Sequence, residues 1–207
     1  AAKSLTTRDD LKRGVIKVLK KLNLQADCSI KLVGISSTLA TNSVAEGKAR
    51  KVALLLIGYD QELVENYGLT EKLPAQNIYY FQGGHNAQGT ELASLDQAGI
   101  ETWIREHAGD YDAIAVSSYF SPLNPQHEEI AMKIIREHTS LPVVMGHQLS
   151  TKLDSIKRAA TASINASLVA VMNDFIQAVR TSLAQMGIQA PLMIVRGDGT
   201  LMPYTEA

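Results

Sequence analysis

Gly34–Arg50 reads GISSTLATNSVAEGKAR and lies between two apolar runs, Ile30–Val33 and Val52–Ile57. This pattern predicts a strand that ends in a polar turn and a short helix before a second strand begins. The polar side chains of the turn are those of Ser36, Ser37, Thr38, Thr41 and Asn42. Such side chains cap helix starts, and the free backbone N–H groups at a helix start can also hold an anion. The stretch is therefore either a plain helix cap or part of a ligand site.

Apolar runs alternate with amphipathic segments along the rest of the chain. Helices are predicted over Leu5–Leu24, Gln61–Asn66, Leu95–His107, Gln126–His138 and Lys152–Met186. Further strands are predicted over Ile78–Phe81, Ala113–Val116, Pro142–Met145 and Pro191–Val195. Strands that alternate with helices form right-handed βαβ units. We therefore expect an α/β fold with a mostly parallel sheet and helices on both faces, as a single domain over residues 1–207.

Polar turns follow several of these strands. His85 lies in the turn Gly83-Gly84-His85-Asn86, His147 follows Gly146, and Asp198 lies in Arg196-Gly197-Asp198-Gly199. Ligands of open α/β sheets bind beyond the carboxyl ends of the strands, so these side chains are expected at one edge together with Thr38 and Asn42. His85 could act as a donor, a base or a metal ligand, or simply belong to a tight turn. A metal shared with His147 stays open, because the two histidines have no diagnostic ligand spacing.

The predicted helix over Lys152–Met186 begins with small residues and one prominent cation, Arg158. Thr161 and Asn165 follow at steps of three and four, on the same face. This face is either a ligand site or a tightly packed surface with Arg158 in a local ion pair. The helix over Gln126–His138 starts at Asn124-Pro125, a capping side chain followed by proline, and we expect His127 and His138 to be exposed at its two ends.

Composition limits the possible partners. The formal net charge is −1, with 45% hydrophobic and 20% charged residues, so charge gives no reason to expect nucleic acid or an anionic membrane as a partner. The one cysteine, Cys28, excludes an internal disulfide framework and fits a reducing, cytoplasmic location. No apolar run is expected to approach the roughly 20 residues that span a bilayer.

The motifs of the chain also carry a family resemblance. Residues 38–55, TLATNSVAEGKARKVALL, resemble the T-L-A-T-N-(A/S)-V-x-E-(G/R)-K signature of the hydantoinase A/oxoprolinase (N-methylhydantoinase) family. The resemblance extends in the same order over nearly the whole chain. Its other elements are Leu5-Thr6-Thr7, Gly83-Gly84-His85, Asn124-Pro125-x-His127-Glu128, Lys157-Arg158 with Thr161 and Asn165-Ala166, and Arg196-Gly197-Asp198-Gly199.

This resemblance implies one lobe of an actin/hexokinase-like ATPase that opens a cyclic amide, such as hydantoin or 5-oxoproline. ATP would phosphorylate the amide oxygen and make it a leaving group for attack by water, with Mg²⁺ and backbone N–H groups balancing the phosphate charge. Catalytic roles are implied for Asp198 and Arg158. Substrate or nucleotide binding is implied for Thr38, Thr41, Asn42, His85, Thr161, Asn165 and Arg196. No metal ligand is assigned.

Two motifs of the family are missing from the sequence. Members carry D-x-G-G-T-x-T-D phosphate motifs and an S-G-P-A-A-G segment, which the printed sequence lacks. We therefore expect an internal piece of a longer enzyme, inactive by itself, whose site is completed by the rest of its chain or by a second hydantoinase-type subunit. A homo-oligomer is also compatible with the sequence. The alternative is a non-catalytic α/β module that pairs with another subunit, as in a carboxylase-type complex, or senses a small molecule. Dinucleotide binding is disfavoured because no G-x-G-x-x-G follows a strand.

Overall fold

The computed structural model describes residues 1–4, 11–22, 30–36, 50–69 and 77–204. Their contacts divide into two compact units. Unit 1 comprises the described residues of Ala1–Asn42 and Val171–Ala207, and unit 2 those of Ser43–Ala170. The sequence analysis predicted a single domain over residues 1–207. Apolar runs indicate where strands lie but not which strands pair, so they do not reveal a division into two units. Some residues singled out in the sequence lie outside the described part of the chain. They are Leu5-Thr6-Thr7, Cys28, Ser37, Thr38, Thr41 and Asn42.

Unit 2 is built on a parallel sheet with the strand order β3-β2-β4-β5. The strands are β2 (Val52–Ile57), β3 (Asn77–Phe81), β4 (Ala113–Ser118) and β5 (Val143–Met145). Leu54 of β2 lies between Ile78 of β3 and Ala115 of β4 in the register. Every residue of β2 and β4 is buried, which is what a central strand covered on both faces requires. The predicted α/β fold with a mostly parallel sheet is confirmed.

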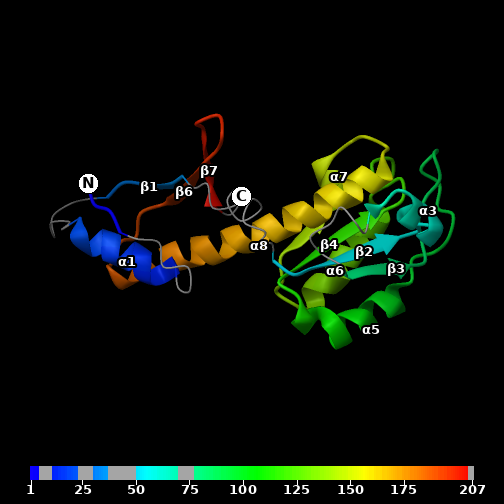
Figure 1. The fold of residues 1–207 in the computed structure, drawn as a ribbon, viewed down its shortest axis with the longest axis horizontal. Coiled ribbons are helices and arrows are strands. Elements are labelled where there is room, and N and C mark those ends of the chain that lie inside the picture. Colours follow the sequence, from blue (N-terminus) through cyan, green and yellow to red (C-terminus); the bar gives the residue numbers. More distant parts are fainter. Residues whose placement is uncertain (5–10, 23–29, 37–49, 70–76, 205–207) are drawn as a thin grey trace. The chain divides into compact units, whose positions relative to one another are not determined.

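Helices cover both faces of this sheet (Figure 1). Val52, Leu54 and Leu56 face the first half of α8 (Ser155–Gln185). The alternate residues of β2 face α5 (Gln97–His107) and α6 (Gln126–His138). Side chains of a strand alternate between the two faces, so β2 contributes to both layers of the core.

Small side chains let α8 approach the sheet closely. Ala159, Ala162 and Ala166 are fully buried against it, and Ser167 Oγ accepts a hydrogen bond of 2.8 Å from the backbone N–H of Arg50. By length and composition alone α8 could also cross a membrane, contrary to the expectation from the sequence. One such helix is weak evidence, because a core helix passes the same test, and the alanine face of α8 belongs to the core of unit 2.

Short elements complete unit 2. They are α3 (Gln61–Asn66), the 3-10 helix η1 (Ala108–Asp110) and α7 (Gly146–Leu149). Local capping follows the sequence: Asp96 accepts from the N–H of Gly99 at the start of α5, and Asn124 accepts from the N–H of Gln126 at the start of α6. On α5, the ring of Trp103 stacks on His107, with centroids 5.6 Å apart and an interplanar angle of 10°.

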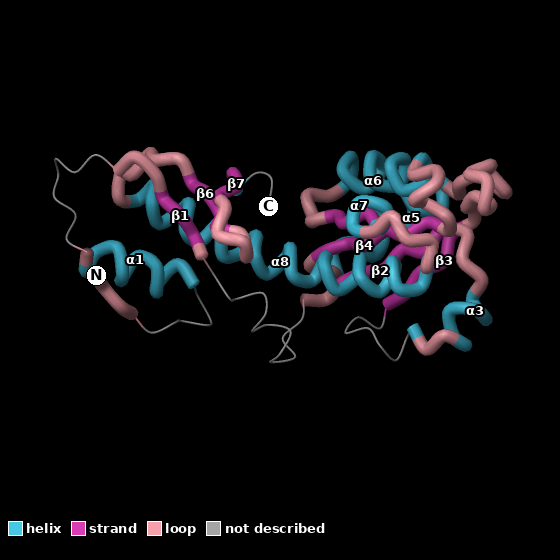
Figure 2. The backbone as a smooth tube through the Cα atoms, turned by 90° about the horizontal axis from the view of Figure 1, so that it is seen from above, coloured by secondary structure: helices cyan, strands magenta, loops and turns pink. Residues whose placement is uncertain are grey.

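Unit 1 contains a small mixed sheet with the order β1-β6-β7 (Figure 2). Its elements are α1 (Leu11–Lys21), β1 (Val33–Ile35), β6 (Leu192–Val195), β7 (Leu201–Pro203) and the second half of α8. Val15 and Leu19 of α1 pack on a core that includes Ile176 and Val179 of α8. Strand β7 was not predicted, because its three residues are too few to show a period; it pairs antiparallel with β6.

The backbone segments that follow β2 and β3 lie in close contact. Gly58 has φ +72°, and a Cβ atom added there would lie 2.5 Å from Gly83 O and 2.7 Å from Gly84 Cα. Gly83 and Gly84 also have positive φ, of 146° and 98°. Three glycines are therefore required for this close approach, which fixes the turn that carries His85.

Replacing Gly58 by alanine should destabilise unit 2 by about 2–4 kcal/mol, because the substitution adds left-handed backbone strain to a backbone clash. Urea unfolding followed by circular dichroism measures this loss. Gly109→Ala is the matched control, since a Cβ there meets nothing within 4 Å. Equal midpoints for the two variants would contradict the assigned role of Gly58.

Candidate functional site

The carboxyl ends of the four parallel strands in unit 2 meet at one edge of the sheet. They lead into Gly58-Tyr59 after β2, Gln82–His85 after β3, and Gly146-His147 after β5, while Ser117-Ser118 ends β4. The structure thus places His85 and His147 at the predicted edge. Asp198 follows β6 of the sheet in unit 1 and does not share this edge.

The carboxylate of Glu128 joins the ends of β4 and β5. It is fully buried in the first turn of α6, where Oε1 accepts from the N–H of Ser118 at 2.8 Å. Oε2 accepts from the N–H of His147 at 2.9 Å, and the Nδ1 atom of the same histidine lies 2.6 Å from it. A negative charge is also favourable at a helix start. One buried side chain therefore holds two strand ends and a histidine ring.

His147 and Glu128 form a carboxylate–imidazole dyad. Because Nδ1 donates to Glu128, the ring has Nε2 left for another partner, and Nε2 makes no hydrogen bond within the described part of the chain. The side chain of His147 is 18% exposed. The hydrogen bond to Glu128 raises the pKa of His147, and burial opposes this shift. His147 therefore keeps its proton at pH values above the ordinary pKa of an imidazole.

Arg158 reaches the same edge from α8. Its guanidinium is buried and donates to two backbone carbonyls, Lys152 O at 2.9 Å and Ser118 O at 3.1 Å. Neither partner is a carboxylate, so a local ion pair does not account for this residue. Its predicted neighbours on the helix separate from it: Thr161 is exposed and donates to Lys157 O, while Asn165 is half-buried.

Tyr59 and Ser117 complete this cluster. The Tyr59 hydroxyl donates to Ser155 O at 2.9 Å and lies 2.8 Å from Ser117 Oγ, which donates to it. Burial raises the pKa of Tyr59 well above its usual range. A Cβ added at Gly146 would lie 3.1 Å from Ser117 Oγ, 3.2 Å from Arg158 Cγ and 3.3 Å from Glu128 Oε1. The absence of a side chain at Gly146 therefore lets these groups gather.

His85 lies beneath the glycine turn with a second histidine. It is fully buried, and its ring centroid is 4.3 Å from that of His127. Among the described residues, neither of its ring nitrogens has a hydrogen-bond partner. Burial, and to a lesser extent His127, lower the pKa of His85. A histidine in this position is held neutral.

His127 is 1% exposed, so the expectation that it would be solvated was wrong. Its Nδ1 accepts from the N–H of Gly84 at 2.9 Å, and its Nε2 lies 3.0 Å from Glu91 Oε1 and donates to it. Helical periodicity assigns core positions to apolar residues and could not reveal this contact. Both nitrogens of His127 are engaged, and the described residues contain no group of three or more His, Cys, Asp or Glu able to hold a metal.

Asp198 and Arg196 lie in the hairpin between β6 and β7. Asp198 Oδ1 accepts from the N–H and the hydroxyl of Thr200, at 2.9 and 2.7 Å, and these bonds lower its pKa. Arg196 Nε lies 3.0 Å from Met202 Sδ. The contacts are those of a tight turn, and the catalytic role of Asp198 stays a prediction.

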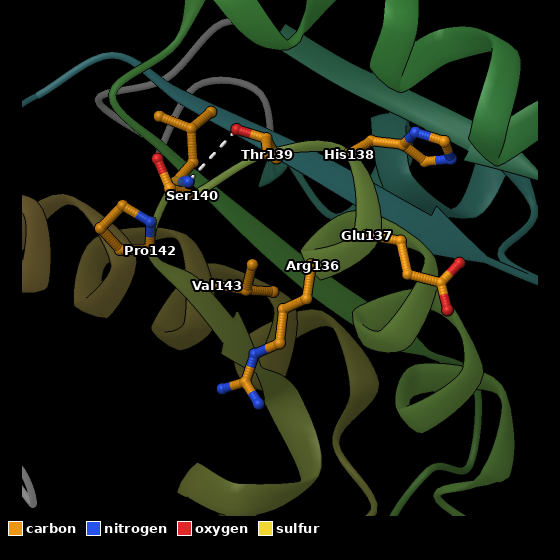
Figure 3. A pocket seen from close by; sticks show the side chains of 8 residues that line it. Arg136, Glu137, His138, Thr139, Ser140, Pro142 and Val143 are labelled. Atoms are coloured by element: carbon orange, nitrogen blue, oxygen red, sulfur yellow. Dashed lines mark hydrogen bonds between the residues drawn. The ribbon is translucent and has the colours of Figure 1, made fainter.

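Two surface hollows are found on unit 2. One, of about 700 Å³, is lined by Arg136–Val143, between the end of α6 and the start of β5 (Figure 3). The other, of about 460 Å³, lies between β3 and α5 and includes Tyr79 and Trp103. Neither contains Glu128, His147 or Arg158.

Comparison with known proteins agrees with the motifs. A profile of the hydantoinase/oxoprolinase N-terminal region matches residues 1–139. The chain belongs to the hydantoinase/oxoprolinase family. The resemblance seen in the sequence is thereby confirmed.

Two relatives of this hydantoinase-family chain are named as enzyme subunits. The caprolactamase subunit alpha of Pseudomonas jessenii is 28% identical, over 86% of the chain and 28% of the relative. The acetophenone carboxylase gamma subunit of Aromatoleum aromaticum is 25% identical, over 96% of the chain and 32% of the relative. The chain thus spans about a third of these proteins.

Solved structures share the fold. An acetone carboxylase in its nucleotide-free form has a TM-score of 0.70 at 14% identity, covering 98% of the chain and 33% of that protein. The ATP-dependent caprolactamase of Pseudomonas jessenii also has a TM-score of 0.70, at 24% identity, covering 98% of the chain and 32% of that protein. These similarities show a shared α/β fold, and the actin-like ATPase lobe stays a prediction.

Sequence reasoning did not select Glu128, Ser117 or Tyr59 as site residues. Glu128 was present in the Asn-Pro-x-His-Glu motif, and the available signal was a carboxylate in the first turn of a helix that follows a buried strand. Ser117 and Tyr59 are ordinary residues at strand ends. Their meeting depends on the register of β2 and β4, which the sequence does not reveal.

The dyad predicts a pH-dependent stability. Because folding raises the pKa of His147, its contribution is fully present below the ordinary value of 6.5 and is lost as pH rises through the raised pKa. His147→Gln should therefore lose less stability than the wild type between about pH 6 and about pH 9. Urea unfolding at both pH values measures the difference, with the exposed His138→Gln as control. Parallel pH profiles for wild type and His147→Gln would contradict the assignment.

Proposed function

We propose that the chain is part of the ATP-using subunit of a cytoplasmic enzyme that opens a cyclic amide. Family membership supports this proposal, as does the similarity to an ATP-dependent caprolactamase, which is named for a lactam. A hydantoin or 5-oxoproline ring is the substrate that the family resemblance favours. Cysteine usage supports the cytoplasmic location.

The observation that carries the proposal is the polar cluster of Glu128, His147 and Arg158 at the carboxyl edge. Buried ionisable groups are costly in a structural core and cluster at functional sites. Phosphorylation of an amide oxygen and attack by water both create negative charge, and positive donors at such an edge would stabilise it. We propose that Arg158 contributes by fixing the end of β4, since it holds Ser118 O.

The remaining assignments form part of the same proposal. Asp198 would be catalytic. Thr38, Thr41, Asn42, His85, Thr161, Asn165 and Arg196 would contact substrate or nucleotide. Of the described residues among these, His85 lies at the carboxyl edge of unit 2, whereas Asp198 and Arg196 belong to the hairpin of unit 1.

The relatives support ATP as the cosubstrate. The described residues do not make a Mg²⁺ site by themselves: Mg²⁺ prefers carboxylate oxygens and phosphates, whereas both oxygens of Glu128 already accept hydrogen bonds. We propose that other parts of the enzyme hold the metal and the nucleotide.

A second candidate is a subunit of a carboxylase-type complex. The similarity to the acetophenone carboxylase gamma subunit supports it, and so does the fold shared with acetone carboxylase. In both candidates a partner subunit is expected, since the relatives are named as subunits alpha and gamma. A homo-oligomer is compatible with either candidate.

The full-length enzyme should hydrolyse ATP in the presence of a cyclic amide, and Arg158→Ala and Asp198→Ala should each lower this turnover by about 10²-fold. Steady-state assays with hydantoin, 5-oxoproline, caprolactam and no added amide test this. Arg136→Ala is the matched control, because Arg136 is exposed and lines the hollow of Figure 3. Arg158→Lys and circular dichroism separate lost chemistry from misfolding.

Turnover that both variants retain would move the chemistry away from these residues. Amide-independent turnover that responds to a ketone and bicarbonate would instead favour the carboxylase candidate.

The 207-residue chain by itself should not turn over ATP, because the D-x-G-G-T-x-T-D motifs are missing from its sequence. A coupled phosphate-release assay with excess Mg²⁺ measures this. Turnover above the background of a buffer control would contradict the expectation that the site is completed elsewhere.

A further inference from the structure

We propose that Nε2 of His147 binds an oxyanion, a phosphoryl or carboxylate oxygen, at the carboxyl edge of β4 and β5. The inference extends the proposed function by naming the chemical group that this edge recognises. It can be tested by binding alone, so its failure and the failure of the proposed function are distinguishable.

The first argument is the fixed geometry of the ring. Glu128 Oε2 accepts from both the backbone N–H and the Nδ1–H of His147, at 2.9 and 2.6 Å. Two bonds from one residue to one oxygen fix both the position and the rotation of the imidazole. The side chain is 18% exposed while Glu128 is fully buried, so the ring is the part of the dyad that a ligand can reach.

The second argument is charge. The charged groups that interact electrostatically with His147 are Glu128 and Glu129 of α6 and Arg158 of α8. The other members of the cluster, Ser117 and Tyr59, are neutral. The buried charges of Glu128 and Arg158 balance, and Glu129 is exposed and screened by water. A proton on His147 therefore leaves the buried cluster with one net positive charge. The donor Nε2–H carries this charge toward the edge.

The third argument is the presence of unsatisfied donors in the same cluster. Arg158 Nε and Ser118 Oγ are buried and have no hydrogen-bond partner in the part of the chain that the structure describes. Such groups are costly to leave unpaired. Both belong to residues that contact the dyad or its neighbours: Ser118 N–H donates to Glu128, and Arg158 holds Ser118 O. Within the described residues, the chain's own groups therefore leave donors close to the dyad unsatisfied.

The lack of a side chain at Gly146 also determines how closely the cluster can pack at this edge. Gly146 precedes His147, and a Cβ there would be within 3.3 Å of Ser117 Oγ, Arg158 Cγ and Glu128 Oε1. The backbone of the β5 end thus lies directly on the charged cluster. This arrangement fixes the orientation of the His147 imidazole. If Glu128 had only a structural role, its third hydrogen-bond donor would not need to be a histidine.

The test is nuclear magnetic resonance of the 207-residue chain with ¹⁵N-labelled histidine. Sulfate, which keeps its charge across the pH range, replaces a phosphoryl group, and acetate replaces a carboxylate. We expect saturable shifts of the His147 signals, with affinity falling as pH rises through the pKa of His147. His147→Gln should weaken binding at least tenfold, as measured by calorimetry, whereas His138→Gln should bind like the wild type.

Glu128→Gln distinguishes a binding dyad from a merely structural one. If the variant folds, its binding should be retained at low pH and its pH midpoint should move downward, because the cause of the raised pKa is removed. Should it unfold, the His147→Gln and His138→Gln pair still decides the question. A response to sulfate but not acetate identifies a phosphoryl site, and the reverse identifies a carboxylate site.

Three outcomes would overturn the inference: no saturable shift at His147, equal affinity in His147→Gln, or affinity that does not depend on pH. ATP turnover by the full-length enzyme together with any of these would leave the proposed function standing without this site.

Discussion

The carboxylate of Glu128 is the constraint on which the described edge of unit 2 depends. Burying a carboxylate costs several kcal/mol unless its oxygens are fully bonded. Here three donors surround it, two backbone N–H groups and one imidazole, and charge-assisted bonds of this kind are stronger than neutral ones. Because one backbone donor ends β4 and the other lies just after β5, one side chain sets the relative position of these strands at their carboxyl ends. The place of His147 follows from that position.

The start of α6 anchors a third strand end through His127, the residue next to Glu128. His127 Nδ1 accepts a hydrogen bond from the N–H of Gly84, and so fixes the glycine turn after β3. His85 and His147, also at this edge, have opposite environments. Burial lowers the pKa of His85 and favours its neutral form, whereas Glu128 raises the pKa of His147 and favours its charged form. Stability from His85 is lost as pH falls below 6.5, the opposite direction to His147. Two imidazoles at one sheet edge are thus held in different protonation states.

Local signals in the sequence were sufficient to predict where helices and strands lie, but not which strands and side chains contact one another. The bounds of β2, α3 and α6 agree with the prediction, since continuous apolar runs and a capped helical period are local. The assignment of strands to two sheets was missed, because β1 pairs with β6 across most of the chain. The burial of His127 and the carbonyl contacts of Arg158 were missed for the same reason. Both depend on backbone groups of other strands, and no side-chain pattern encodes these.

The single tryptophan of the chain lies in unit 2, stacked on His107 and 4.7 Å from the ring of Tyr79. Emission from Trp103 therefore reports on the layer between β3 and α5, and a change confined to unit 1 is silent in this signal. Far-ultraviolet dichroism sees helices of both units. Unfolding curves recorded with the two probes need not coincide, and a difference between them would reveal whether the two compact units lose their structure together.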